Sequence, residues 1–432
     1  MNAGGRVPPA AKQAHAPAEA PIEVSVEAGY AASDCIAQTL DPKRLRGERL
    51  ANVRAMMAEQ GMAAVLLFDP YNQRYATGSR NMFGYFLRNS TRYIFVPAEG
   101  NVILFEYPGS AHISTWLETI DEARPSKTVF AAVNGRDHLT TKPFAEEIAG
   151  LVREVAGKGG KIGLDRCFHN IALALEAEGL KVVDCLQNLL DTRRIKTADE
   201  TQCLALSMAA TEAAVADVEE AIRPGITENE LFAKMVHGVL ARGGEFVETR
   251  LLSSGPRTNP WFNEACDRSV RPGDLVALDT DTIGVNGYYA DMSRTFFCGK
   301  GRPTGYQKSL YRMSLEQIQH NTDILKPGMT FREIAEKAWP IPEKFYDQRY
   351  PSIIHGVGMH GEKPIVAHAG DLDRYTGEGV LEPGMVVSVE SYVGEPGGAD
   401  GVKLEDQFLV TETGLAAMSR YPYEDRLIDR QI

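Results

Sequence analysis

The segment DLVALDTDTIGVNGYYADMSRTF, residues 274–296, constrains the fold of this chain more than any other stretch. Two strand-like runs flank the dipeptide Asn286-Gly287, which is a strong signal for a β-hairpin. A two-residue loop would pair Asp281 with Met292 and place Asp291 on the other face. A three-residue loop over 285–287, with Gly287 left-handed, pairs Asp281 with Asp291 instead. Loop length therefore decides which side chains meet.

The three-residue loop predicts a cluster of carboxylates. Asp279 lies two residues before Asp281 and so shares its face of the strand, where Asp291 also lies in this register. Like charges directly opposite one another are destabilising, so the arrangement favours a bound cation. The alternative is a surface hairpin with solvated aspartates. Apolar residues in the segment and directly after it favour a buried strand and hence a metal: Val276, Leu278, Phe296 and Phe297.

Later segments supply further candidate ligands. His355 lies between an apolar strand and a glycine-rich turn in IIHGVGMHGEKP. Glu390 ends the strand-like run MVVSVE, and Glu405 lies inside GVKLEDQFLV. A carboxylate at such a place is costly unless it is paired or bound to a metal, whereas a lone His there is more often a hydrogen-bonded core residue. Five carboxylates and one imidazole would suit two divalent ions such as Mn, Fe, Co or Zn.

Patterning along the chain predicts two domains after a leader. Residues 1–40 are rich in Ala and Pro, and we expect them to be disordered. Alternating strand and helix patterns over 41–192 predict a compact α/β domain. From 193 to 432, long helices give way to strand-rich sequence, which predicts an α+β domain with a largely antiparallel sheet. Thr227 and Glu230 form a capping-box pattern at the start of one of its helices.

Composition excludes several classes of protein. The 432 residues carry 46 Lys and Arg against 58 Asp and Glu, and this acidic excess argues against a nucleic-acid-binding protein. No apolar run is long enough to span a membrane, and the first residues contain no apolar stretch suited to a secretion signal, so we expect a cytoplasmic protein. The six cysteines include no CxxC pair, which is typical of reduced thiols in the cytoplasm.

The quoted segments resemble the pita-bread metalloenzymes of the peptidase M24 family, which includes proline-specific peptidases, creatinase and the DddP-type lyases of dimethylsulfoniopropionate (DMSP). The ordered set Asp, Asp, His, Glu, Glu and the junction sequence RRIKTADE carry the resemblance over about residues 45–430. It implies a creatinase-like N-terminal domain, a pita-bread catalytic domain and a homodimer. It also implies a metal-ligand set, which leaves open whether Asp279 or Asp281 is the main ligand: Asp279, Asp281, Asp291, His355, Glu390 and Glu405.

Within the family, the DTD pattern, RLLSSGPRTNPWF and FDPYNQRYATGSRNM are most similar to the DddP group. Proline-specific peptidases carry a histidine after the SGP motif, where this chain has Trp261 or Phe262. They carry a second histidine seven residues after the metal histidine, where this chain has Glu362. DddP-type enzymes have an aspartate that resembles a general base six residues after the metal histidine. Here that position is Gly361, so His360 or Glu362 becomes the candidate base.

The resemblance implies a lyase that splits DMSP into acrylate and dimethyl sulfide by base-assisted β-elimination. The sulfonium needs a cation-tolerant wall, which aromatic rings provide. We therefore expect substrate contacts from Tyr350, Trp261 and Tyr85, and a contact between Arg257 and a substrate carboxylate. Ordinary packing is the alternative for Tyr85, and an exposed loop position is the alternative for Arg257. The competing hypotheses are a metal-dependent C–N hydrolase and a binding module that has lost catalysis.

Overall fold

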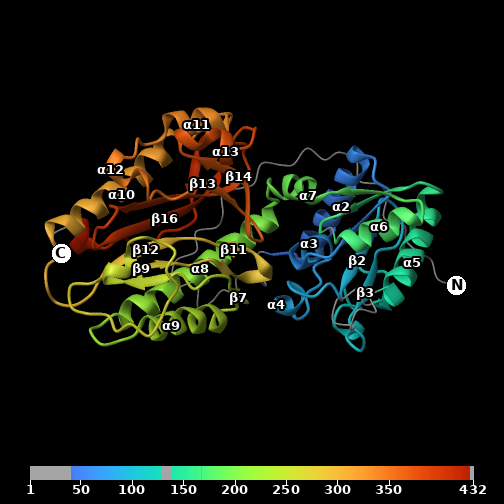
Figure 1. Cartoon of the computed structure of the whole chain (residues 1–432), viewed down its shortest axis with the longest axis horizontal. Coiled ribbons are helices and arrows are strands. Elements are labelled where there is room, and N and C mark those ends of the chain that lie inside the picture. Colours follow the sequence, from blue (N-terminus) through green and yellow to red (C-terminus); the bar gives the residue numbers. More distant parts are fainter. Residues whose placement is uncertain (1–39, 128–137, 167, 429–432) are drawn as a thin grey trace. The chain divides into compact units, whose positions relative to one another are not determined.

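The computed structural model describes residues 40–127, 138–166 and 168–428, and the expected leader lies outside these residues. The described chain divides into two compact units, one over Pro42–Thr192 and the other from Arg193 onward (Figure 1). No helix of the described part is long and apolar enough to cross a bilayer. Cys185, Cys203, Cys266 and Cys298 are all free thiols.

The N-terminal unit is built on a six-stranded mixed sheet in the order β4-β3-β2-β1-β5-β6. Its elements are α2 (Pro42–Gln60), β1 (Ala64–Leu67), α3 (Pro70–Thr77), α4 (Phe83–Phe86), β2 (Tyr93–Pro97), β3 (Ile103–Glu106), η2 (Ala111–Ile113), β4 (Glu122–Pro125), α5 (His138–Ala156), β5 (Lys161–Leu164), α6 (His169–Ala177), β6 (Lys181–Asp184) and α7 (Leu186–Arg193).

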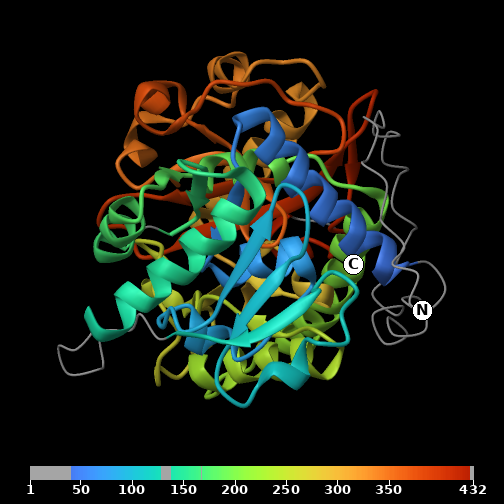
Figure 2. The ribbon, with the colours of Figure 1, turned by 90° about the vertical axis from the view of Figure 1, so that its right-hand side faces the viewer.

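Apolar strands and amphipathic helices form the core of this unit. Phe144, Ile148 and Val152 of α5, with Ile171 and Leu175 of α6, pack on the strands in one buried cluster. Figure 2 shows α5 on one side of the strands and α2 on the other. The α/β architecture expected from the alternating pattern is confirmed.

The C-terminal unit contains an eight-stranded sheet in the order β14-β13-β15-β16-β12-β9-β8, with β17 also pairing with β16. Every pair of neighbouring strands in it is antiparallel, as expected. The unit's strands are β7 (Phe246–Val247), β8 (Leu252–Ser254), β9 (Leu275–Asp279), β10 (Thr282–Ile283), β11 (Tyr289–Ala290), β12 (Ser293–Phe297), β13 (Ser352–Val357), β14 (Gly361–Ala367), β15 (Val386–Gly394), β16 (Gly401–Val410) and β17 (Leu415–Ala417).

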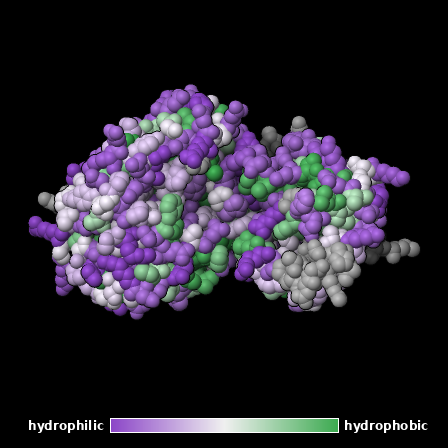
Figure 3. Space-filling model, in the orientation of Figure 1, coloured by the Kyte–Doolittle hydropathy of each residue, from purple (hydrophilic) through white to green (hydrophobic). Residues whose placement is uncertain are grey.

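The C-terminal unit also contains helices and short 3-10 turns, and its long helices pack on the apolar face of the sheet. The helices and turns are α8 (Ala198–Ala221), α9 (Glu228–Ala241), η3 (Gly255–Thr258), η4 (Val285–Gly287), α10 (Gly305–Ile324), α11 (Phe331–Lys337), α12 (Glu343–Tyr346), η5 (Ala369–Asp371), α13 (Leu372–Tyr375) and α14 (Asp425–Ile428). Side chains of α10 and α11 share a buried cluster with β15 and β16, and those of α8 and α9 share another with β9 and β12. Figure 3 shows hydrophilic residues over much of the outer surface in this view.

Strand alternation separates the helix-covered face from a polar face. On β16, Val402 and Leu404 lie in the core cluster with α10, so Lys403 and Glu405 point the other way. On β15, Val387 and Val389 belong to the same cluster, and Glu390 lies on the opposite face. The polar face is therefore where the candidate ligands gather.

Capping boxes begin four helices of the C-terminal unit, and that expected at Thr227 and Glu230 is confirmed. At the start of α8, the Thr197 hydroxyl accepts the Glu200 N–H, and the Glu200 carboxylate accepts the Thr197 N–H at 2.9 Å. These bonds satisfy amide groups that a helix start leaves without partners.

Replacing Thr197 with Ala should lower the free energy of unfolding by about 1 kcal/mol, because the cap's side-chain acceptor is lost. Urea unfolding followed by circular dichroism measures the change. Thr413→Ala, at an exposed turn, is the matched control and should have little effect. Equal stability of the two variants would contradict the capping role.

Candidate metal centre

Buried carboxylates form a row across four neighbouring strands. Asp279 on β9 lies opposite Ser293 on β12, and Ser293 lies opposite Glu405 on β16. Glu405 in turn lies directly opposite Glu390 on β15. The three carboxylates are at most 3% exposed. Like charges paired across strands in a buried sheet are unfavourable without a counter-charge.

The hairpin adds two more carboxylates to this row. Thr282 pairs with Ala290 and Asp279 pairs with Ser293, so the same register places Asp281 opposite Asp291. This confirms the three-residue loop over 285–287 expected from the sequence. Ligand oxygens of Asp279, Asp281 and Asp291 all lie within 4.8 Å of one another. A single cation could therefore contact all three side chains.

Asp281 is held in an unusual backbone conformation. Its φ is 39°, in the left-handed region that non-glycine residues rarely occupy. The Tyr289 hydroxyl donates to its Oδ1 at 2.6 Å, and the Thr249 hydroxyl donates to its Oδ2. These two bonds fix the carboxylate, and Tyr289 lies two residues before Asp291 on the same hairpin.

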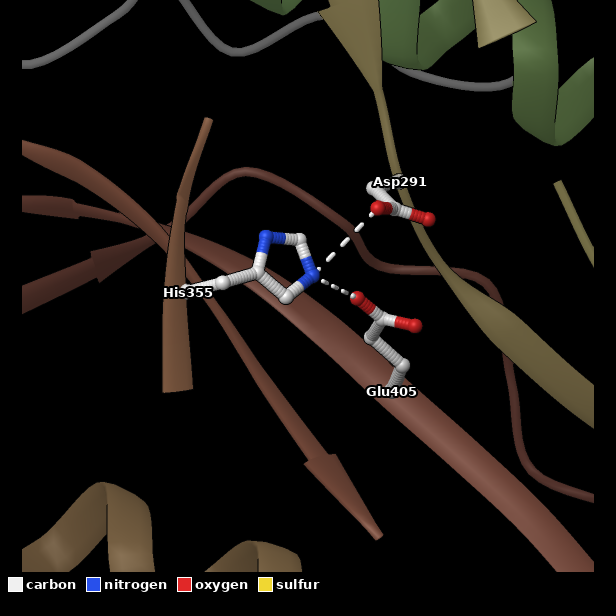
Figure 4. A group of neighbouring side chains, drawn as sticks. All are labelled: Asp291, His355 and Glu405. Carbon is white, nitrogen blue, oxygen red and sulfur yellow. Dashed lines mark hydrogen bonds and ion pairs between the residues drawn. The ribbon is translucent and has the colours of Figure 1, made fainter. Parts of the chain in front are cut away.

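The imidazole of His355 completes a second group of ligand atoms. His355 is on β13, and its Nε2 lies 3.1 Å from Glu405 Oε1 and 3.4 Å from Asp291 Oδ2 (Figure 4). Glu390 Oε1 lies 3.7 Å from the same nitrogen. The two groups share Asp291 and Glu390 lies beside His355, so the structure brings together all six residues that the sequence analysis singled out as ligands.

Burial and neighbouring charges shift the pKa values of the side chains in this cluster. Burial, together with the neighbouring carboxylates, raises the pKa of Asp291 well above its ordinary value. Burial likewise raises the pKa of Asp279, although the Lys403 ammonium opposes the shift. Burial would lower the pKa of His355, but Glu390 and Glu405 outweigh it and raise the pKa to about 9. Burial would raise the pKa of Glu405, but Lys403 and His355 hold it well below its usual range.

The donor set fits a divalent metal. Oδ1 of Asp291 is buried and has no hydrogen-bond partner among the described residues, which leaves a lone pair free for a cation. Carboxylate oxygens with one imidazole nitrogen suit hard to borderline divalent ions. Asp279, Asp281 and Asp291 would hold one ion, and Asp291, His355 and Glu405 would hold another, with Glu390 adjacent to His355.

Several polar residues of the centre were not predicted. The buried Lys403 ammonium contacts Glu390 and Glu405. The Ser293 hydroxyl lies between Asp279 Oδ1 and Glu405 Oε2, at 2.8 and 3.0 Å, and Gln407 accepts the Asp291 N–H. Lys403 and Gln407 each lie two residues from Glu405 on β16. The period-two rule for strands would have placed them on the same face.

Aromatic side chains lie beside the carboxylates. The Lys403 Nζ lies 4.5 Å from the centre of the Tyr350 ring, which also faces the Phe262 ring at 5.4 Å. Phe262 is 55% exposed, so this aromatic pair reaches from the cluster to the surface. Trp261 is buried against Tyr392, and its Nε1 has no hydrogen-bond partner among the described residues.

The two candidate bases lie in different surroundings. Glu362 is fully buried, with Arg193 Nε 3.0 Å from Oε1 and Lys196 Nζ 2.9 Å from Oε2. Burial would raise its pKa, but Lys196 and Arg193 lower it. His360 is partly exposed, and its Nε2 lies 3.1 Å from Arg193 Nη2. Gly361, between these two candidate bases, has no side chain that could act as a base, and a Cβ atom added there would have no atom within 4 Å.

Two other expected substrate contacts have partners outside the carboxylate cluster. The Arg257 guanidinium pairs with Glu228, the buried first residue of α9, and donates to the Glu264 carbonyl at 2.8 Å. Tyr85 belongs to the N-terminal unit, where its ring packs on Phe86 and Tyr107. The ion pair with Glu228 holds the Arg257 guanidinium against the start of α9, and its contact with substrate stays a prediction.

Known proteins match both units. Residues 49–195 match the creatinase/prolidase N-terminal domain, and residues 202–412 match metallopeptidase family M24. The chain is 35% identical to dimethylsulfoniopropionate lyase DddP of Roseovarius nubinhibens over 90% of this chain and 89% of that protein. It is 28% identical to the probable dipeptidase PepE of Mycobacterium tuberculosis over 87% of this chain and 95% of that protein.

Solved structures share the fold. An Xaa-Pro dipeptidase from Bacillus anthracis matches with a TM-score of 0.71 and 23% identity, covering 88% of this chain and 99% of that one. The prolidase from Pyrococcus furiosus matches with a TM-score of 0.67 and 23% identity over 85% and 99%. The pita-bread architecture and the creatinase-like N-terminal domain expected from the sequence are confirmed.

Replacing Asp291 with Ala should abolish metal uptake, because this carboxylate belongs to both groups of ligand atoms. Elemental analysis of protein purified from medium with Mn, Fe, Co and Zn measures the bound metal. Asp373→Ala, at a side chain that is 96% exposed, is the matched control and should keep the wild-type content. Wild-type metal content in the Asp291 variant would contradict the proposed ligand set.

The metal-free protein should lose thermal stability as the pH rises from about 5 to about 9. Raised folded-state pKa values of Asp279, Asp291 and His355 mean that the folded state binds protons more tightly than the unfolded state, and this advantage disappears as those groups deprotonate. Tm measured across this range with a chelator present gives the slope. Asp291→Asn should flatten the slope, and a Tm that rises with pH would contradict the assignment.

Proposed function

The chain belongs to metallopeptidase family M24. Within this family, we propose that it acts as a metal-dependent lyase that eliminates dimethyl sulfide from DMSP. The observation that carries the proposal is a group of carboxylates and one imidazole beside the aromatic rings of Tyr350 and Phe262. Similarity to two DddP lyases over about nine tenths of the chain supports the same reaction. A dinuclear centre is part of this proposal, since two groups of ligand atoms share Asp291.

The substrate's two charged ends match two parts of the site. DMSP carries a carboxylate and a sulfonium, separated by two methylene groups. Divalent ions held by the centre would bind the carboxylate and acidify the adjacent C–H. Tyr350 and Phe262 then offer π-faces to the sulfonium, at about 0.5–2 kcal/mol for each ring. Phe262, 55% exposed, would lose solvent contact when the substrate binds.

Elimination requires a base that removes a proton from the carbon next to the carboxylate. The electron pair of that C–H bond forms the C=C bond of acrylate, and the C–S bond breaks with its pair leaving on dimethyl sulfide. Glu362 is a poor base, because protonating it would weaken two buried ion pairs. His360, partly exposed at the turn before β14, is the better candidate.

The test is headspace dimethyl sulfide from the metal-loaded protein incubated with DMSP. Strong release that a chelator abolishes is expected. His360→Ala should then reduce kcat by about 10²–10⁴-fold, the usual contribution of a general base. Glu362→Gln should mainly lower Tm, because it disrupts the pairs with Arg193 and Lys196.

An aspartate introduced at residue 361 should restore the lyase activity that is lost when His360 is replaced. Gly361 has open space at its Cβ position and an ordinary backbone conformation, so an aspartate fits there. The double variant His360→Ala, Gly361→Asp should recover activity lost in the single His360 variant. Full activity in His360→Ala would overturn the base assignment while leaving the lyase intact.

A metal-dependent C–N hydrolase is the second candidate, favoured by Gly361 and by the similarity to the probable dipeptidase PepE. Turnover of an Xaa-Pro dipeptide without any dimethyl sulfide from DMSP would support it and overturn the lyase. The two assays use the same metal-loaded preparation. Turnover in one of them shows that the protein is active, so absence of turnover in the other then reflects substrate specificity.

A further inference from the structure

We propose that Lys403 is the permanent counter-cation of the metal centre: it stabilises the centre when metal is absent and weakens divalent-metal binding by electrostatic repulsion. This inference rests on the metal centre of the proposed function and concerns a residue outside the ligand set. It assigns the lysine a role in setting metal affinity.

Lys403 lies at the middle of the carboxylate row and is fully buried. Its Nζ lies 2.8 Å from Glu405 Oε2, 3.0 Å from Glu390 Oε2 and 3.6 Å from Asp279 Oδ2. The Tyr350 ring lies 4.5 Å from the same nitrogen. One ammonium therefore offsets the repulsion among the carboxylates of three strands.

The lysine and the histidine contact different oxygens of the same carboxylates. Glu405 turns Oε2 to Lys403 and Oε1 to His355 at 3.1 Å. Glu390 likewise turns Oε2 to Lys403, while its Oε1 accepts from Ser352 and lies 3.7 Å from His355 Nε2. A metal bound beside His355 would thus share both carboxylates with the ammonium.

The charges of the metal-loaded centre balance if the Lys403 ammonium keeps its position and its charge when the metal ions bind. The five carboxylates of the centre carry five negative charges when ionised. Two divalent ions balance four of these, and the Lys403 ammonium balances the fifth with His355 neutral. Because all these charges lie within a few ångströms in a buried site, the ammonium must repel each metal ion, and its removal must strengthen metal binding.

Lys196 provides a matched control, because it is a second buried lysine in the same unit. Its Nζ contacts Glu362 Oε2 at 2.9 Å and the Arg193 carbonyl at 2.6 Å. It pairs with a carboxylate that is not a candidate ligand. Losing it should therefore destabilise the protein without changing metal affinity.

The experiment compares Lys403→Met and Lys196→Met in the full chain. Calorimetric titration of chelator-treated protein with Mn²⁺ alone gives the dissociation constant, and Tm is measured with and without Mn²⁺. Lys403→Met should lower the metal-free Tm, bind Mn²⁺ about tenfold more tightly and recover stability when loaded. Lys196→Met should lower both Tm values equally and keep the wild-type dissociation constant.

Unchanged or weaker Mn²⁺ binding by Lys403→Met would overturn the inference, because a packing or ligand-orienting lysine predicts that result. If Lys403→Met folds only with Mn²⁺ present, the counter-cation role is supported. If it does not fold in either state, Lys403→Gln removes the charge while keeping donors, and the same tightening is expected of it. Wild-type protein that binds no Mn²⁺ would instead overturn the metal centre itself.

Discussion

Repulsion among carboxylates on one face of a buried sheet is the constraint on which the C-terminal unit depends. Glu390 and Glu405 are opposite each other on neighbouring strands, and the hairpin brings the carboxylates of Asp281 and Asp291 close to Asp279. Burial raises the cost of each charge, because water cannot screen it. Such a cluster requires bound protons or cations; Lys403 supplies one positive charge, and the metal ions proposed to bind would supply the others.

Strand alternation makes this arrangement compatible with a stable core. Alternate residues of β15 and β16 contribute Val387, Val389, Val402 and Leu404 to the cluster packed against α10 and α11. The residues between them point to the polar face and carry the centre. The same strands thus bury apolar surface on one side and hold charges on the other, which couples the geometry of the site to the core.

Local patterns allowed much of the centre to be predicted from the sequence. The Asn286-Gly287 turn predicted the hairpin but left two registers, because the register depends on the length of the loop; the structure has the three-residue loop that gathers Asp279, Asp281 and Asp291. Lys403 was missed although its spacing from Glu405 already placed it on the same face. The partners of Glu362 and Arg257 could not be predicted, because Lys196 and Glu228 are distant in sequence and meet them only through the tertiary fold.

Anomalous X-ray diffraction from crystals grown with Mn²⁺, recorded on both sides of the metal absorption edge, shows whether the carboxylate cluster is a divalent-metal centre. We expect anomalous peaks about 2.0–2.3 Å from ligand atoms, one beside Asp279, Asp281 and Asp291 and one beside Asp291, His355 and Glu405. Density without anomalous signal, with Lys403 as the centre's only cation, would contradict this expectation.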